Sequence, residues 1–252
     1  MIFQDIFNFV IYEPLYNGLV FFTTIAPEHS LGISIITLTI LVRFILFPLS
    51  HKSIKTQATL RNIDPEIKKV KEQYKENKQQ QAQEVMKLYK KHGVNPFSGC
   101  LFVFVQIPII FGLYYVFWKG LAGGVIDESL LYSFVHFTND INFSFLTIFD
   151  LKEKNIFLAA IAGISQFIQM RLALPPTNKN ETVTDNSFSE QFKKNMAFQA
   201  RFVLPAVVFF VAIGFPSAIA LYWITSNVFS IAHELIVRKR ATLLLKKNPP
   251  QS

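Results

Sequence analysis

Apolar residues along the chain are gathered into five long blocks that polar segments separate. A helix rises about 1.5 Å per residue, so a block of about 20 residues matches the roughly 30 Å hydrocarbon layer of a bilayer. Segments that cross lipid have to be helical, because lipid offers the backbone no hydrogen bonds. Gly214, Phe215 and Pro216 leave almost no loop between the last two blocks, which predicts a tight hairpin there. We therefore predict an all-α integral membrane protein with five transmembrane helices, at residues 31–50, 96–118, 156–174, 202–215 and 217–237.

The N-terminal residues 1–30 are also apolar, but polar and helix-breaking residues interrupt them. We interpret this segment as an external amphipathic helix that lies in the membrane interface. A sixth span would put the N-terminus on the inner side, against the distribution of charge along the chain. The interrupting residues are Asn8, Glu13, Pro14, Asn17 and Gly18.

Residues 51–95 predict a cytoplasmic helical hairpin. Asp64 suits an N-cap, Asn77 suits the turn between two helices, and Gly93 suits a helix end. Pro65 fits the first turn of the first of these helices. Each helix carries only a thin apolar stripe, so we expect the two to pack on each other and to move relative to the membrane part. The stripes are Ile67, Val70 and Tyr74 in one helix and Val85, Leu88 and Tyr89 in the other.

Charge is distributed unevenly between the two sides of the predicted spans. The net charge of +8 would suggest nucleic acid in a soluble protein, but residues 51–95 carry eleven Lys or Arg against five acidic residues, and residues 1–30 carry no Lys or Arg. Basic residues are concentrated on the cytoplasmic side of membrane proteins. We therefore predict an external N-terminus, an external segment at 119–155, a cytoplasmic loop at 175–201 and a short basic cytoplasmic tail at 238–252. Direct binding of nucleic acid is not expected.

Arg43 is a charged residue inside the first predicted span. A charge at such depth costs about 2.5 to 3.5 kcal/mol on insertion scales, so it needs water, a counter-ion or polar partners. The five spans contain no Asp or Glu apart from Glu234, which lies near the inner end of the last one. An internal ion pair is therefore disfavoured. Contacts with carbonyl groups or side-chain amides remain open, and a water-filled cavity is the interpretation that we favour.

Other polar residues in the spans are candidates for the wall of such a cavity. Polar side chains in spans usually face the interior of the bundle, where a simple hydrogen bond between helices explains each one taken singly. Their number around one arginine favours a hydrophilic groove instead. The candidate groove residues are Arg43, Thr39, Gln106, Gln166, Gln169, Trp223, Ser226 and Asn227.

The sequence lacks the patterns that predict catalysis or metal binding. The single cysteine, Cys100, excludes an intrachain disulfide, and we interpret it as a small packing residue. The five histidines are scattered, and we find no Ser-His-Asp set, paired carboxylates or glycine-rich phosphate loop. We therefore expect a protein that is not an enzyme, with no catalytic residues, no metal and no cofactor.

Four segments in order resemble the YidC/Oxa/Alb family of membrane-protein insertases. They are Leu41-Val-Arg-Phe-Ile-Leu-Phe-Pro-Leu49, Leu88-Tyr-Lys-Lys-His-Gly-Val-Asn-Pro96, Gly99-Cys-Leu-Phe-Val-Phe-Val-Gln-Ile-Pro108 with Leu113-Tyr-Tyr115, and Phe215-Pro-Ser-Ala-Ile-Ala-Leu-Tyr-Trp223 with Asn227. A basic hairpin between the first two spans belongs to the same pattern. The chain departs from it at Ala218, where the family usually has glycine, and in its short basic tail.

The resemblance implies a five-helix core around a hydrophilic groove that opens to the cytoplasm and to lipid. Arg43 falls on the groove arginine of the family, Gln169 and Trp223 fall on groove positions, and Glu13-Pro-Leu15 falls on the external amphipathic helix. The chain resembles a minimal bacterial form, because the large periplasmic domain and the lipoprotein signal of other members are absent from it.

The expected function is a membrane-protein insertase and chaperone that works without nucleotide. It would take polar flanks of nascent membrane proteins into the groove and release their apolar helices into lipid, alone or with the Sec translocon. The expected partners are these nascent substrates and the lipid bilayer, and the ribosome or signal-recognition machinery are candidates. The expected location is the bacterial cytoplasmic (inner) membrane, with the N-terminus outside and the C-terminus inside. The alternative is a small-anion transporter that uses Arg43 as its binding charge.

Overall fold

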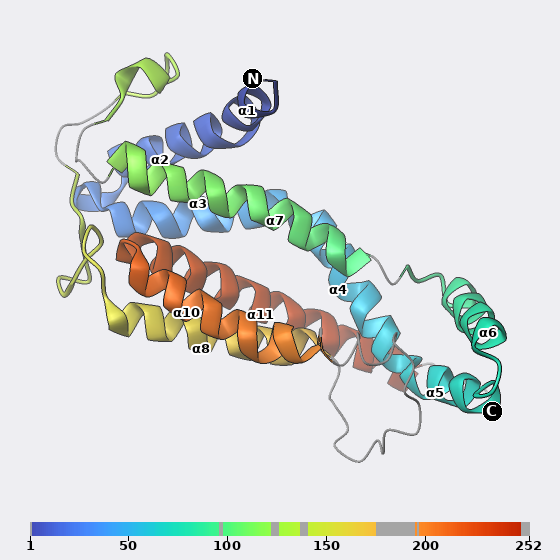
Figure 1. Ribbon diagram of the computed structural model, residues 1–252. Coiled ribbons are helices and arrows are strands. Elements are labelled where there is room, and N and C mark those ends of the chain that lie inside the picture. Colours follow the sequence, from blue (N-terminus) through green and yellow to red (C-terminus); the bar gives the residue numbers. More distant parts are fainter. Residues whose placement is uncertain are drawn as a thin grey trace.

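The computed structural model describes residues 2–95, 98–121, 126–136, 141–174, 195 and 197–247. Within this part of the chain the protein is a bundle of long helices with a helical hairpin at one end (Figure 1). The all-α class predicted from the apolar blocks is therefore confirmed in its main feature. The predicted loop at 175–201 lies largely outside the described residues, and so does the Cys100 side chain.

The first predicted span is broken by a kink. Helix α3 covers Leu31–Ile45, helix α4 covers Phe47–Asn62, and the two are bent by 66° at the break. Pro48 lies in the first turn of α4, where its ring clashes with the carbonyl four residues earlier and it has no N–H to donate. Residues 31–50 are thus not one straight helix, and Arg43 lies in the last turn of α3.

The N-terminal segment forms α1 (Ile2–Phe7), a π-helical turn (Asn8–Tyr12) and α2 (Glu13–Ile25). One face of α2 is buried against α3. Gly18 allows the close approach, because a Cβ atom there would lie 3.0 Å from the Leu38 side chain. The predicted amphipathic helix is therefore packed on the bundle, and its place in a membrane interface stays a prediction.

Helices α7 and α8 form the middle of the chain. Helix α7 covers Ser98–Tyr115 and continues as a π-helix to Leu121, and α8 covers Ile156–Ala173. Asn155 caps α8, because its side chain accepts hydrogen bonds from the N–H groups of Phe157 and Leu158 at 2.9 and 3.0 Å. This cap explains why the helix begins where the predicted span begins.

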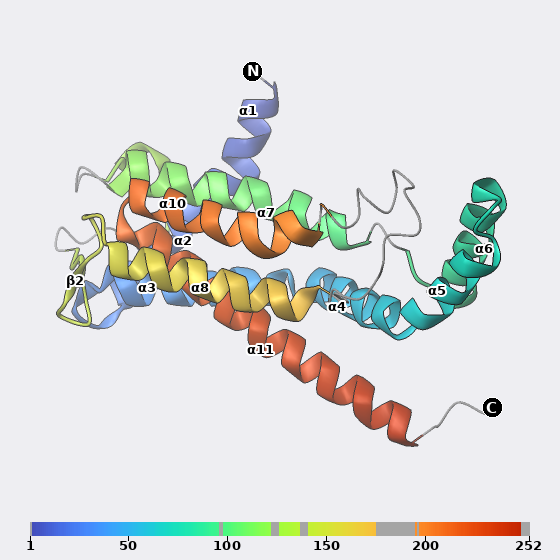
Figure 2. The same ribbon diagram turned by 60° about the horizontal axis from the view of Figure 1, so that its bottom comes forward.

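The last two helices form the predicted tight hairpin. A π-helical turn (Gln199–Val203) leads into α10 (Leu204–Gly214), and only Phe215 and Pro216 separate it from α11 (Ser217–Lys247). Helix α8 packs against both α10 and α11. Helix α11 extends beyond the bundle (Figure 2), so the predicted tail is helical as far as Lys247.

Length and apolar composition single out few of these helices as membrane spans. Among the described residues, one unbroken helix, Ile156–Ala173, is long and apolar enough to cross a membrane, and the bent pair α3 and α4 makes a second candidate. Gln106–Trp118 and Gln199–Gly214 are apolar but shorter. In α11, polar residues such as Asn227 and Glu234 interrupt the apolar sequence. The count of five spans therefore stays a prediction.

A short β-ribbon that the sequence did not predict lies at the end of the bundle where α3, α8 and α11 begin (Figure 1). Strand β1 (Ser144–Phe145) pairs antiparallel with β2 (Phe149–Asp150). The flanking chain caps two helices, because the Leu31 N–H donates to the Asn142 carbonyl and the Ser217 N–H donates to the Glu153 carbonyl, both at 2.9 Å. The ribbon segment therefore supplies acceptors that helix starts otherwise lack.

The hairpin consists of α5 (Asp64–Gln73) and α6 (Lys78–Lys91). Asn77 caps α6 by accepting a hydrogen bond from the Gln80 N–H at 3.0 Å, and Gly93 has a φ of 63° after the end of α6. The turn predicted at Asn77 and the helix end predicted at Gly93 are therefore confirmed. The prediction that Asp64 is an N-cap is wrong, because Ile63 already has helical backbone angles and Asp64 belongs to the first turn.

The hairpin has a small apolar core of its own. Ile63, Ile67 and Tyr89 are buried in it, and Leu60, Val85, Leu88 and Val94 pack around them. Ile63 and Leu60 come from the junction with α4, which the two predicted stripes did not include. Burial, with the nearby Asp64 carboxylate, raises the pKa of Tyr89. Figures 1 and 2 show the hairpin at the far end of α4, away from the helices of the bundle.

Candidate functional site

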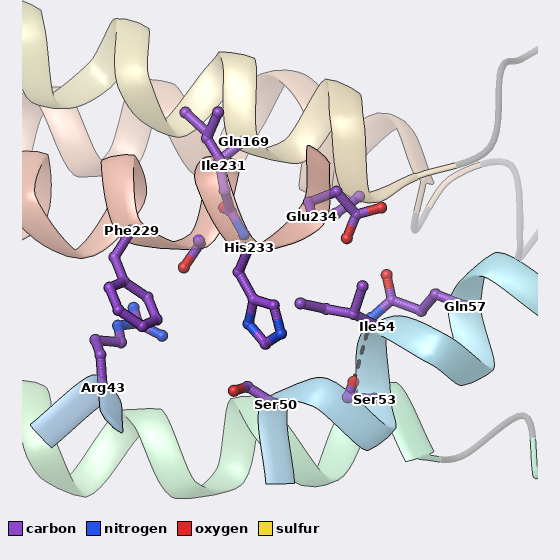
Figure 3. Close-up of a pocket in the computed structure, with 12 residues that line it drawn as sticks. Arg43, Ser50, Ser53, Ile54, Gln57, Gln169, Phe229, Ile231, His233 and Glu234 are labelled. Atoms are coloured by element: carbon purple, nitrogen blue, oxygen red, sulfur yellow. Dashed lines mark hydrogen bonds between the residues drawn. The ribbon is translucent and has the colours of Figure 1, made fainter. Parts of the chain in front are cut away.

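A hollow opens beside the kink, between α4, the end of α8 and the middle of α11 (Figure 3). Its volume is about 500 Å³ when the adjoining open solvent is counted. Polar groups from four helices, α3, α4, α8 and α11, line it, together with a few apolar side chains. The lining residues are Arg43, Ser50, Ser53, Ile54, Gln57, Gln169, Ala173, Phe229, Ser230, Ile231, His233 and Glu234.

Arg43 lies at one end of this hollow and is 8% exposed. Its guanidinium donates a hydrogen bond to the hydroxyl of Ser226 on α11. A hydroxyl partner is neutral, so it orients the guanidinium without cancelling its charge. The sequence left contacts with carbonyl groups or side-chain amides and a water-filled cavity as alternatives for Arg43. The structure gives Arg43 a hydroxyl partner and places it at the hollow, and a water-filled cavity stays a prediction.

The contact of Arg43 with α11 extends to a third helix through Tyr222. The Tyr222 hydroxyl interacts with Ser226 and accepts a hydrogen bond from the Gln106 amide of α7 at 2.5 Å. Tyr222 is 4% exposed. Sequence reasoning did not single it out, although its spacing of four residues from Ser226 places both side chains on one face of α11.

The amides on α8 and α11 make one hydrogen bond between the helices and one within α8. Asn227 donates to the Ser165 hydroxyl at 3.0 Å, which is the simple interhelical hydrogen bond considered for each polar residue. Gln166 donates to Gln169 at 3.0 Å along α8, and Gln169 faces the hollow. The groove prediction therefore suits Gln169 better than Asn227.

Two other predicted groove residues lie away from the hollow. The Thr39 hydroxyl donates to the Ile35 carbonyl of its own helix at 2.6 Å, one turn before Arg43. Trp223 packs where the two apolar cores of the bundle meet. Of the eight predicted residues, Arg43 and Gln169 line the hollow, and Ser226 and Gln106 belong to the network behind Arg43. Thr39 and Gln166 bond within their own helices, Asn227 bonds to another helix, and Trp223 packs between the two cores.

A pair of histidines that looked scattered in the sequence meets beside the kink. The Nδ1 of His51 on α4 lies 3.2 Å from the Nε2 of His233 on α11. Phe47 stacks on His233 with ring centroids 4.5 Å apart. In the part of the chain that the structure describes, His, Cys, Asp and Glu side chains form no group of three or more that could hold a metal ion. The pair therefore acts as a contact between α4 and α11.

Glu234 connects the mouth of the hollow to the end of α8. It is 4% exposed and accepts a hydrogen bond from the Arg238 Nε at 3.0 Å. Arg238 also donates to the carbonyl of Leu172, in the last turn of α8. A cation at a helix C-terminus interacts favourably with the free carbonyl groups there. The pair thus fastens α11 to α8.

Comparison with known proteins identifies relatives over most of the chain. The model of the family described as 60Kd inner membrane protein matches residues 21–244. A Membrane protein insertase YidC of Streptomyces avermitilis is 33% identical, over 82% of this chain and 50% of that protein. The protein of the same name from Wolinella succinogenes is 36% identical, over 86% of this chain and 34% of that protein. Membrane protein insertase MisCA of Bacillus subtilis is 32% identical, over 86% of this chain and 73% of that protein. The chain thus spans half or less of the first two relatives.

Proposed function

Because the chain belongs to the 60Kd inner membrane protein family, which is the YidC/Oxa/Alb family that its motifs resemble, we propose that it inserts proteins into the bacterial cytoplasmic membrane. Its substrates are nascent membrane proteins, and it acts on them in the lipid bilayer. The proposed orientation has the N-terminus outside and the C-terminus inside, as the distribution of basic residues predicts.

The hollow beside Arg43 is the observation that carries the proposal. A buried guanidinium beside an open, polar-lined hollow attracts the acidic or polar flank of a substrate more strongly than a charge in bulk water, because the surrounding dielectric is lower. Ser50, Ser53 and Gln57 supply further hydrogen-bonding groups along α4. Such a site lowers the cost of taking a polar flank out of water.

Apolar side chains next to the hollow support a sideways exit into lipid. Phe44 and Ile45 on α3 are 60% and 67% exposed, and Val228 on α11 is 55% exposed. An apolar segment whose flank is held near Arg43 would slide along these faces and leave into the bilayer. The process needs binding and release but no covalent step, so the proposal includes no catalytic residue. The Sec translocon, the ribosome and signal-recognition machinery are proposed as further partners.

Reconstitution of the purified protein in liposomes tests the proposal. A short single-span substrate with an acidic flank should become protected from added protease in vesicles that contain the protein, well above its level in empty vesicles. Anion flux measured in the same vesicles tests the transporter alternative. Equal protection with and without the protein would reject the insertase, and flux that depends on Arg43 would favour the transporter.

A further inference from the structure

The tip of the β-ribbon carries two large apolar side chains in exposed positions. Leu146 is 66% exposed and Ile148 is 76% exposed, although both lie at the end of a bundle whose core is apolar. The charged residues Asp150 and Lys152 follow directly, and both are exposed. The segment therefore combines an apolar tip with a charged base.

Two aromatic contacts fix the position of the ribbon along the long axis of the bundle. Phe145 covers Gly32 in the first turn of α3, where a Cβ atom would lie 2.3 Å from the phenylalanine ring. Phe149 stacks on Phe157 in the first turn of α8, with ring centroids 6.1 Å apart and planes within 8°. Each strand of the ribbon is thus held level with the first turn of a long apolar helix.

The ribbon contacts the start of α8 through Phe149 and Phe157, and α8 carries exposed apolar side chains of its own. Ile156 and Phe157 at the start of this helix are 69% and 61% exposed, and Ile164 further along is 60% exposed. Helix α8 is also the one unbroken helix among the described residues that is long and apolar enough to cross a membrane. The apolar tip and the apolar start of α8 therefore lie at the same end of the bundle, where Phe149 and Phe157 join the ribbon to the helix.

The backbone of the turn at the tip is strained at Leu146 and Thr147. Leu146 and Thr147 have φ values of 54° and 60°, which favour Asn and Gly and are unusual for Leu and for the β-branched Thr. The Thr147 hydroxyl donates to the Leu146 carbonyl at 2.6 Å. Asn or Gly would fill these turn positions with less strain, so the apolar Leu146 is not accounted for by the turn itself.

We propose that the ribbon tip, Leu146 and Ile148, is an interfacial anchor that inserts into lipid beside the start of α8. The partner is the lipid surface itself, at the boundary between headgroups and acyl chains. The charged base stays in the headgroup layer, as in other amphipathic segments that lie in the interface. The anchor holds the end of the bundle at a set depth. This inference rests on α8 crossing a membrane, which belongs to the proposed function.

Depth-dependent quenching in vesicles of phosphatidylcholine and phosphatidylglycerol tests the anchor. Single cysteines at Leu146 or Ile148, in a Cys100→Ser background, are labelled with the fluorophore NBD. Glu153→Cys is the matched control in the same segment, because it is exposed but polar, and Ile164→Cys is the control for the span. Lipids with bromine near the headgroup should quench both tip positions at least about twofold more than position 153. Lipids with bromine near the bilayer centre should quench position 164 most.

Two outcomes overturn the proposal and can be told apart. If position 164 is quenched while the tip positions behave like position 153, the span stands and the anchor is wrong, and the tip would then be free for a protein partner. If position 164 is not quenched either, the anchor and the membrane placement of α8 fail together.

A pair of variants separates the apolar contact from the turn. In the chain labelled at position 148, Thr147→Gly relaxes the strained backbone and keeps Leu146, so quenching at this position should be unchanged. Adding Leu146→Asn keeps a favourable turn but removes one apolar side chain, so quenching at Ile148 should fall. Equal quenching in the two variants would contradict a lipid contact of the tip.

Discussion

His51 and His233 are 182 positions apart in the sequence, yet their imidazole nitrogens lie 3.2 Å apart. The contact joins α4, just after the 66° bend, to α11. Phe47 stacks on His233, so the first two turns of α4 are held by an aromatic contact at Phe47 and by the imidazole contact at His51. This pair keeps the bent helix against α11 at the side of the hollow.

A double-mutant cycle should measure this contact. His51→Ala and His233→Ala each remove one partner, so the double variant should lose less stability than the sum of the two, by about 0.5 to 1.5 kcal/mol. Thermal unfolding in detergent gives the loss of stability of each single variant and of the double variant. His29 lies in the turn before α3, so His29→Ala combined with His51→Ala is the control and should be additive. Additive losses for His51 and His233 would contradict the contact.

Arg43 is predicted to act through its charge. Arg43→Lys should keep most insertion of a substrate with an acidic flank, whereas Arg43→Ala should lower it roughly tenfold, because attraction between charges at low dielectric is worth more than 1 kcal/mol. A matched substrate with a neutral flank should be affected less. Ser226→Ala removes the hydrogen-bond partner and keeps the charge, so it should resemble Arg43→Lys. If Arg43→Ala slows both substrates equally and lowers the melting temperature, Arg43 has only a structural role.

The hairpin is predicted to open independently of the bundle. Its core is small, so hydrogen exchange in α5 and α6 should be much faster than in α8. Ile63→Ala should weaken the hairpin locally by about 2 to 4 kcal/mol, because it removes a buried side chain at the junction with α4. Val70→Ala is the control, since Val70 lies outside this core and should change exchange little. Protection of the hairpin equal to that of α8 would show that it is docked.

The orientation can be tested by labelling in intact cells. Single cysteines at Asp5 and at Glu153, in a Cys100→Ser background, should react with an impermeant thiol reagent from outside. A cysteine at Lys78, in the turn of the hairpin, should react only after the membrane is permeabilised. Labelling of position 78 in intact cells would reverse the predicted orientation.

Local patterns in the sequence determined where several helices begin and end. Asn77 and Gly93 act on the backbone next to them, so their effect could be predicted without the fold. Helix α8 also matches its apolar block, because the length of such a block depends on neighbouring residues alone. Pro48 carries a comparable local signal, yet the span predicted over residues 31–50 does not include a kink.

Tertiary structure alone decided which of the polar residues meet. Nothing near His51 in the sequence points to His233, and nothing near Ser226 points to Arg43, because these contacts depend on how α3, α4 and α11 pack. The contact of Phe145 with Gly32, which fixes the position of the ribbon, also depends on how distant segments pack. Hydrophobic periodicity reports how one segment divides its residues between apolar and polar surroundings. It does not report which distant segment supplies those surroundings. The candidate site is built from contacts between such distant segments.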